Sequence, residues 1–257
     1  VQGKSLLTSI GDNAFENTGL TSFEFPSTKV PLAVGALGET MFKNCKYLTT
    51  VKLSDTVTDI TKVFDLCRSI TKFEVPMENG VPLGYFVEEN GILYNVVKNA
   101  AGEATTNTEI AYALGDVSGT FTVKEGITVL KASVFAGKAN LKKVELPQSL
   151  IEIEDKAFMD CFNLEEVTFA KDCVLSELGE AAFKNCIALK SIAIPNGVKK
   201  LNPYTFYNCR SLETVTLPNQ LTHIGYKTYS STDSTEVIST SGGYVFAHCE
   251  SLSAIDI

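Results

Sequence analysis

The sequence has little that would support catalysis or metal binding. Among its 257 residues are only two histidines, His223 and His248, and His248 directly precedes Cys249. Adjacent residues of a turn point in different directions, so this pair cannot form a Cys–His dyad by itself. No cysteines have the C-x-x-C spacing of zinc sites, and no phosphate-binding or nucleophile-elbow motif follows a predicted strand. We therefore predict no enzyme, no cofactor and no metal site.

Two weaker chemical candidates come from single segments. Asp233 and Glu236 could offer oxygens to calcium, but they are too few for its six or seven ligands unless other loops contribute. Cys173 is the one candidate for a reactive thiol, because it lies outside the repeat pattern of the other cysteines. The interpretation that we favour for Cys173 is a partly buried residue in a slightly lengthened turn.

Positive charge and long apolar runs are also scarce. The chain has 22 Lys and Arg against 30 Asp and Glu, a formal net charge of −8. Nucleic acids and anionic membranes both attract clustered basic residues, so we predict neither as a partner. No apolar run approaches the ~20 residues that a membrane-spanning helix needs. The chain begins Val1-Gln2-Gly3 without Met, which is typical of a mature or trimmed product and leaves export undecided.

What the sequence does contain is a repeat of about 23 residues. Each copy has a Phe at the same place, the Phe column: Phe15, Phe42, Phe64, Phe135, Phe158, Phe183, Phe206 and Phe246. Three residues later, six copies have a Cys, the Cys column: Cys45, Cys67, Cys161, Cys186, Cys209 and Cys249. Thr18 and Lys138 take that place in the other two copies. A Leu or Ile and then an alternating apolar segment follow in most copies.

The pattern predicts one strand and one turn per copy. Alternating segments such as 212–217, LETVTL, are typical of short half-buried strands, and the Pro that often follows ends the strand. We expect the segment around Phe and Cys to form one helical or 3-10 turn, with both side chains on one face. A single copy cannot bury its apolar side, so the copies must stack into one elongated core.

The repeated position of the cysteines favours a packing role. Neighbouring helical turns would lie ~8–10 Å apart, whereas a disulfide needs Cα atoms ~4.4–6.8 Å apart. We therefore expect the six cysteines of the Cys column to be reduced and buried, as small apolar residues.

Two interruptions divide the repeat. Residues 77–126 are predicted to form a β-rich island, with Asn90-Gly91 as a type I′ hairpin turn and two further strands after it. Residues 227–243 are rich in Ser and Thr and are predicted to form a protruding or mobile loop. The expected organisation is N-terminal repeats over 1–76, the island over 77–126 and C-terminal repeats over 127–257, in one continuous solenoid domain.

The motif A-F-x-x-C-x-x-L-x-x-[VI]-x-[IL]-P resembles the BspA-like class of leucine-rich repeats over most of residues 6–257. This resemblance implies an α/β, right-handed, curved solenoid with parallel strands on the concave side and short helical or 3-10 turns on the convex side. The class occurs mainly in bacterial surface proteins. It therefore implies a secreted or cell-surface module for adhesion to, or recognition of, a protein ligand, such as a host matrix or surface protein. A structural spacer that displays another domain is the alternative.

On leucine-rich strands, the residues that flank the inward apolar position face the concave solvent. This places the following residues on the predicted binding row: Lys52, Lys72, Glu74, Lys143, Glu145, Glu166, Thr168 and Thr216. The row lacks the Trp, Tyr and Arg that dominate protein interfaces. Tyrosines of the island and the loop are alternative anchors, or else ordinary half-buried strand residues: Tyr85, Tyr94, Tyr112, Tyr226 and Tyr229. The last strand, at Ile257, has no polar cap, so a second copy could associate there.

Overall fold

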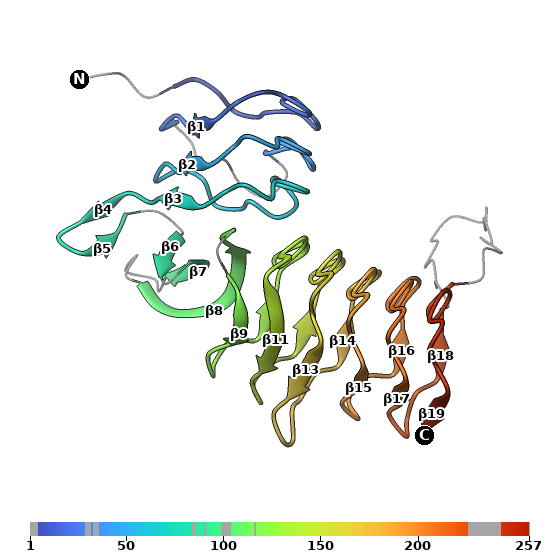
Figure 1. The fold of residues 1–257 in the computed structure, drawn as a ribbon. Coiled ribbons are helices and arrows are strands. Elements are labelled where there is room, and N and C mark those ends of the chain that lie inside the picture. Colours follow the sequence, from blue (N-terminus) through green and yellow to red (C-terminus); the bar gives the residue numbers. More distant parts are fainter. Residues whose placement is uncertain are drawn as a thin grey trace, which may run out of the picture. The chain divides into compact units, whose positions relative to one another are not determined.

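The computed structural model describes residues 5–28, 32, 36–83, 86–89, 91–98, 104–115, 117–225 and 243–256. These residues form short strands joined by turns, and none of them is helical (Figure 1). Two compact units make up the chain. The first comprises Val1–Val117 and Leu130–Lys138, and the second comprises Ser118–Val129 and Ala139–Ile257.

The first unit starts with a parallel three-stranded sheet, one strand per coil of the chain. Its strands are β1 (Ser22–Glu24), β2 (Thr50–Lys52) and β3 (Lys72–Glu74). They pair in register, so that Phe23, Val51 and Phe73 are aligned. After β3 come two short strands of two residues each, β4 (Met77–Glu78) and β5 (Val81–Pro82), which pair antiparallel.

Of the predicted island over 77–126, the hairpin belongs to the first unit and the last stretch, 118–126, belongs to the second unit. β6 (Phe86–Glu89) and β7 (Ile92–Lys98) pair antiparallel around Gly91, whose φ is +80°. Glycine adopts this left-handed conformation without a Cβ clash. β8 (Ala104–Ala113) then pairs antiparallel with β7. The hairpin is thus confirmed, and so are the two strands predicted after it, as β8 and β9 (Gly119–Thr122).

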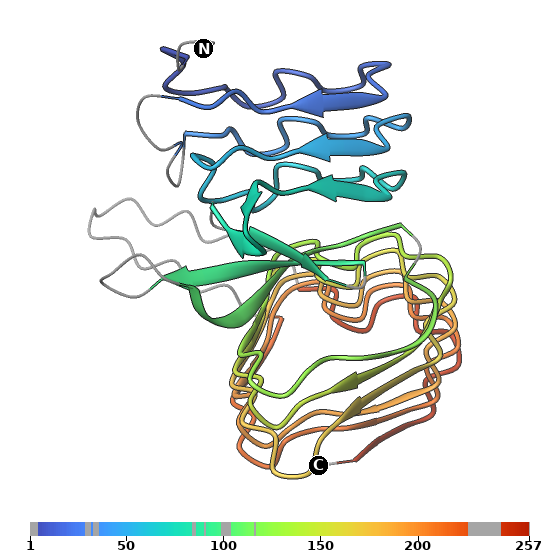
Figure 2. The ribbon, with the colours of Figure 1, turned by 90° about the vertical axis from the view of Figure 1, so that its left-hand side faces the viewer.

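The second unit is a stack of parallel coils, and Figure 2 looks along it. One face is a six-stranded parallel sheet in the order β19-β17-β15-β13-β11-β9. Its strands are β9 (Gly119–Thr122), β11 (Leu141–Leu146), β13 (Glu166–Phe169), β15 (Ser191–Ala193), β17 (Thr214–Thr216) and β19 (Ala254–Asp256). Shorter parallel pairs join β12 (Glu152–Ile153) to β14 (Glu177–Leu178) and β16 (Lys200–Leu201) to β18 (His223–Ile224). β10 (Val129–Leu130) spans the division between the units.

The strands end where the sequence predicts. In β15, Ile192 is 3% exposed and its neighbours are exposed, which is the expected alternation. The backbone N–H of Ile194 donates to the Thr216 carbonyl of the next coil at 2.9 Å. Pro195 follows and has no N–H to donate, so the ladder cannot continue through it. The predicted parallel solenoid is thereby confirmed within each unit.

The predicted helical turns are wrong. A right-handed helix needs φ near −63° at every residue, but each turn has positive φ two residues before and two residues after its column Phe. Around Phe183, for example, Ala181 has φ +56° and Asn185 has φ +63°. The same two places have positive φ in all the other coils: Asn13 and Asn17, Thr40 and Asn44, Lys62 and Leu66, Ser133 and Gly137, Lys156 and Asp160, Tyr204 and Asn208, Tyr244 and His248.

The alternation of positive and negative φ points some backbone N–H groups of the turn to the next coil and others into their own coil. The N–H of Phe183 donates to Thr205 of the next coil at 2.9 Å, and that of Asn185 donates to Tyr207 at 2.8 Å. Between them, the N–H of Lys184 donates within its own coil, to Ala181 at 3.1 Å. Because a helix would direct all of these groups along its own axis, it could not bond to the neighbouring coil. The turns are therefore a second inter-coil ladder.

The Phe column forms a stack of rings in each unit. In the second unit, Phe183 lies 5.2 Å from Phe158 and 5.6 Å from Phe206, each with an interplanar angle of 1°. In the first unit, Phe42 stacks on Phe15 at 5.0 Å and on Phe64 at 5.3 Å. Phe42, Phe158, Phe183 and Phe206 have no solvent exposure. Such stacking adds ~0.5–1.5 kcal/mol per pair to the free energy of burial.

The Cys column has a hydrogen-bonding role as well as a packing role. The Cys67 thiol donates to the Phe42 carbonyl of the preceding coil at 2.9 Å, and Cys209 donates likewise to Phe183 at 3.2 Å. All seven cysteines are free thiols; five of the column are buried and Cys249 is half-buried. The distance of ~8–10 Å expected between neighbouring helical turns does not apply, because coils joined by backbone hydrogen bonds lie ~4.7–4.9 Å apart.

Candidate binding surfaces

The exposed strand face of the first unit brings together three residues of the predicted row. Lys52 Nζ lies 2.7 Å from Glu24 Oε1, and Lys72 Nζ lies 2.6 Å from Glu74 Oε1. The hydrogen bond to Glu24 raises the pKa of Lys52, and the bond from Lys72 lowers the pKa of Glu74. Both pairs are exposed, so they are strongly screened by solvent and orient the charges more than they stabilise the unit.

The exposed strand face of the second unit carries a bridged cluster, which we call the Lys143 cluster. Lys143 Nζ lies 3.1 Å from Glu166 Oε1 on the next strand and 3.3 Å from Glu145 Oε1 on its own strand. Thr122 Oγ1 donates to Glu145 Oε2 at 2.7 Å. The bond to Glu166, and then that to Glu145, raises the pKa of Lys143, while the bond from Thr122 lowers the pKa of Glu145.

Smaller side chains continue this face towards β19. Thr168 is half-buried, and its Oγ1 donates to the Val144 carbonyl at 3.4 Å. Thr216 is exposed and pairs in register with Ala193 and Asp256. Of the eight predicted binding residues, three therefore lie in the first unit and five in the second.

The tyrosines proposed as anchors do not lie on the surface where they are described. Tyr94 is 3% exposed and Tyr112 is 8% exposed. Tyr112 donates from its hydroxyl to the Cys67 carbonyl at 2.5 Å, and its ring packs against Phe73 at 5.4 Å. Burial raises the pKa of Tyr112 far above its usual value. Both are therefore core residues and cannot anchor a partner.

Several predicted features lie outside the described residues. They are Tyr85, Asn90, Tyr226, Tyr229, Asp233, Glu236, the Ser/Thr-rich segment up to Gly242, and Ile257. The two ends that flank the segment do meet, because a Cβ added to Gly243 would overlap the backbone of Gly225. Only a pair of glycines allows this approach of the two backbones.

A cluster of aromatic residues on the turns of the second unit was not predicted; we call it the tyrosine cluster. The Tyr204 ring stacks on Tyr244 at 5.6 Å and contacts Tyr207 at 5.7 Å. His248 meets Tyr207 edge to face at 5.1 Å, and Lys184 Nζ lies 5.3 and 5.1 Å from the Tyr204 and Tyr207 ring centroids. The repeat alignment contained the signal, since Tyr204 and Tyr244 both stand two residues before their column Phe.

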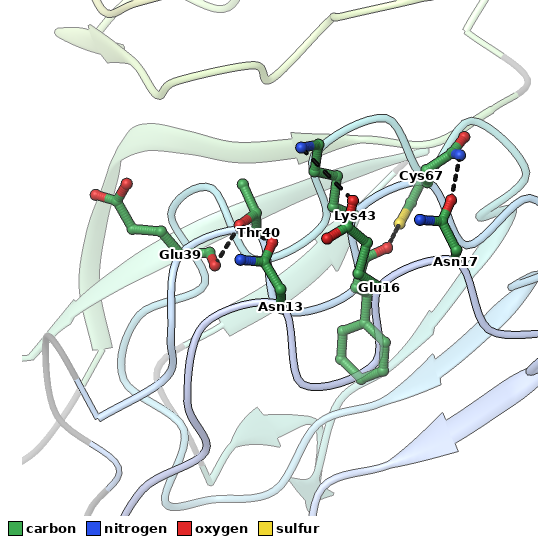
Figure 3. A network of polar contacts seen from close by, with 9 residues as sticks. Asn13, Glu16, Asn17, Glu39, Thr40, Lys43 and Cys67 are labelled. Carbon is green, nitrogen blue, oxygen red and sulfur yellow. Dashed lines mark hydrogen bonds and ion pairs between the residues drawn. The ribbon is translucent and has the colours of Figure 1, made fainter.

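The turns of the first unit are polar at the corresponding places (Figure 3). Thr40 Oγ1 donates to Asn13 Oδ1 at 2.7 Å, and Lys43 Nζ lies 3.6 Å from Glu16 Oε1. Asn17 accepts a hydrogen bond from the matching asparagine of the next coil at 2.5 Å. These contacts join one coil to the next along the surface.

The thiols show no sign of activation. Burial raises the pKa of Cys67 to about 12 and also raises the pKa of Cys173, whereas a nucleophilic thiol needs a lowered pKa. Within the ranges that the structure describes, no three His, Cys, Asp or Glu side chains are grouped as a metal site. Over the same ranges, a helix long and apolar enough to cross a bilayer is also lacking.

Stacked parallel coils with a recurring Phe, Cys and Leu define a leucine-rich-repeat solenoid. The family model described as "BspA type Leucine rich repeat region" matches residues 2–83 and 128–253, in six copies. The chain belongs to this family, as the motif predicts. No curated protein matches the chain.

Solved structures show the same fold. A leucine-rich cell surface protein from Faecalibacterium prausnitzii superposes with a TM-score of 0.68 at 23% identity, over 97% of this chain and 63% of that protein. A leucine-rich repeat protein from Eubacterium ventriosum superposes with a TM-score of 0.69 at 22% identity, over 96% of this chain and 57% of that protein. The pneumococcal vaccine antigen PcpA superposes with a TM-score of 0.51 at 18% identity, over 84% of this chain and 65% of that protein. The chain thus spans about three-fifths of the length of the first two proteins.

Proposed function

We propose that this chain is a non-enzymatic, surface-displayed module that binds a protein ligand through the exposed strand faces of its coils. Support comes from the family, and from the similar F. prausnitzii structure, which is described as that of a cell surface protein. The expected ligand is a host matrix or surface protein, with adhesion as the result. The chain would act outside the cell.

The observation that carries this proposal is the Lys143 cluster. Its ammonium group is held between two carboxylates, and Thr122 fixes one of these carboxylates. Because these side chains are already ordered on a parallel ladder, they would lose less conformational entropy when a partner binds. An ordered pattern of mixed charge favours specificity and fast association with a partner of complementary pattern.

The test inverts the pattern while it keeps the ion pair. The double variant Lys143→Glu/Glu166→Lys exchanges the two charges but loses the pair between Lys143 and Glu145. It should lower the melting temperature only slightly, because exposed pairs contribute little to stability. Lys171→Glu changes an exposed charge elsewhere in the second unit and is the matched control. Binding to an array of immobilised extracellular-matrix proteins would be measured for all three proteins.

We expect saturable binding that the exchange weakens by about tenfold and that the control retains. If the wild-type chain binds no protein of the array, or if the exchange leaves binding unchanged, the strand face is not the binding surface. The structural spacer would then be the better description.

A further inference from the structure

We propose that the tyrosine cluster is a second binding site, which takes an acidic segment of a partner protein. Its members lie on three consecutive coils of the second unit: Lys184 on the first, Tyr204 and Tyr207 on the next, and Tyr244 and His248 on the third. Tyr is among the residue types that contribute most to protein interfaces, and the predicted binding row of the strand faces has none. The site does not depend on the Lys143 cluster.

The backbone of the cluster disfavours the residues that it carries. Tyr204 has φ +60° and Tyr244 has φ +45°. Bulky side chains are unfavourable in this left-handed region, whereas Asn and Gly tolerate it. Asn13 occupies the place of Tyr204 in the first coil, so the fold accepts a better-suited residue there.

Burial does not compensate for this unfavourable backbone. Tyr244 is 52% exposed, Tyr204 and Tyr207 are half-buried, and His248 is exposed. The aromatic rings therefore contribute less apolar burial than the fully buried rings of the Phe column do. Every coil has these left-handed places, but Tyr occupies them only at Tyr204 and Tyr244, and this local choice of residue points to a functional constraint.

The contacts within the cluster indicate the charge of its ligand. Tyr204 lies between Lys184 of the preceding coil and Tyr244 of the following coil, so both of its ring faces have partners. On Tyr204, the parts left for a ligand are ring edges, which carry partial positive charge, and the hydroxyl group, which can donate. Lys184 adds an ammonium group that the rings hold in place.

An acidic peptide matches these groups better than a sugar or a cation does. Sugars stack on open aromatic faces, and Tyr204, the ring between Lys184 and Tyr244, has none. Arg210, whose Nε donates to Asn208 Oδ1 at 2.9 Å on the Tyr207 coil, adds a second positive charge. Acidic residues on these and the adjoining coil include Glu180, Glu250 and Asp160, and Asp160 already accepts from Asn185 Nδ2 at 2.7 Å. Carboxylates accept charge-assisted hydrogen bonds from Lys and Arg, and they also accept from Tyr hydroxyls.

The test uses poly-L-glutamate as the probe and the full chain as the receptor, at physiological salt. Tyr204→Asn/Tyr244→Asn removes two rings and places Asn in two left-handed positions, so its melting temperature should not fall. Lys184→Glu reverses the central charge. Tyr47→Ala, which removes an exposed tyrosine of the first unit, and Lys171→Glu are the matched controls.

We expect saturable binding of poly-L-glutamate, weakened at least about tenfold by Tyr204→Asn/Tyr244→Asn and by Lys184→Glu, and retained by both controls. The Lys143→Glu/Glu166→Lys exchange should not affect this binding, which separates the two proposals. The inference is overturned if the chain does not bind poly-L-glutamate, or if the cluster variants bind as well as the wild type. It is equally overturned if heparin binds in preference, because the site would then take a sulfated polysaccharide.

Discussion

Raising the pH should destabilise the second unit through the buried thiols of the Cys column. Cys186 and Cys209 have no solvent exposure, and each thiol donates a hydrogen bond to a carbonyl of the preceding coil, at 3.2 Å in both cases. Burial raises the pKa of both thiols well above the usual value. An ionised sulfur would lose its hydrogen bond and face a carbonyl oxygen, so the thiols stay protonated in the folded chain.

The sign and size of the effect follow from proton linkage. In the unfolded chain a cysteine has a pKa of about 8.5, so the unfolded state releases the proton first and becomes favoured as the pH rises. Between about pH 8 and pH 9.5 the free energy of unfolding falls by about 1.2 kcal/mol for each such thiol. Cys186 and Cys209 together therefore remove about 2.5 kcal/mol, a large part of the roughly 5–15 kcal/mol typical of a folded domain.

Urea unfolding followed by circular dichroism at a series of pH values would measure this slope. In the variant Cys186→Ala/Cys209→Ala, the loss over the same pH interval should be smaller than in the wild type by about 2.5 kcal/mol. Between about pH 6 and pH 7.5 the two proteins should have parallel profiles, because neither state releases thiol protons there. Equal slopes above pH 8 would refute this reasoning, because the two thiols would then ionise as readily in the folded chain as in the unfolded chain.

Three further substitutions test the packing of the coils by thermal or urea unfolding. Phe206→Ala removes a fully buried ring of the Phe column and should cost ~3–5 kcal/mol; a loss below ~1 kcal/mol would show that the ring is not core. Gly179→Ala should destabilise, because its Cβ would overlap the backbone nitrogen of Asp155 in the preceding coil, whereas Gly19→Ala, with open space, should not. Asn185→Ala should destabilise more than Asn185→Gly, since both lose the amide but only Gly tolerates φ +63° freely; equal losses would contradict this.

The sequence was sufficient for the parts of the fold that depend on one coil. Alternation in 212–217 predicted β17, and Pro195 marked the end of β15, because both signals act within a few residues. Gly91 marked the hairpin for the same reason. The repeat of about 23 residues then predicted that the coils stack, and this stacking buries the Phe column.

The turns were misjudged because a spacing of three residues between Phe and Cys suits a helix and also suits two consecutive tight turns. The deciding signal was the Asn at Asn17, Asn44, Asn185 and Asn208, since Asn tolerates positive φ. The distance expected between cysteines of neighbouring coils was wrong for the same reason, because it was derived from the packing of helices and the turns are not helical. The tyrosine cluster was overlooked for a related reason: its members approach one another only because adjacent coils bond through their turns.

Within each turn, the backbone N–H groups bond alternately to the next coil and within their own coil, so a turn does not tolerate the insertion of a single residue. One inserted residue between Phe183 and Cys186 would exchange the groups that bond outward with those that bond inward, so every later donor of that turn would face the wrong way. The loops outside the turns and strands carry no such constraint, whereas a strand has its own period of two residues. This accounts for column spacings that vary from 22 to 27 residues between uninterrupted neighbours while the step from Phe to Cys stays at three. Evolution in such an array can lengthen a loop freely, but it can edit a turn only by replacing residues.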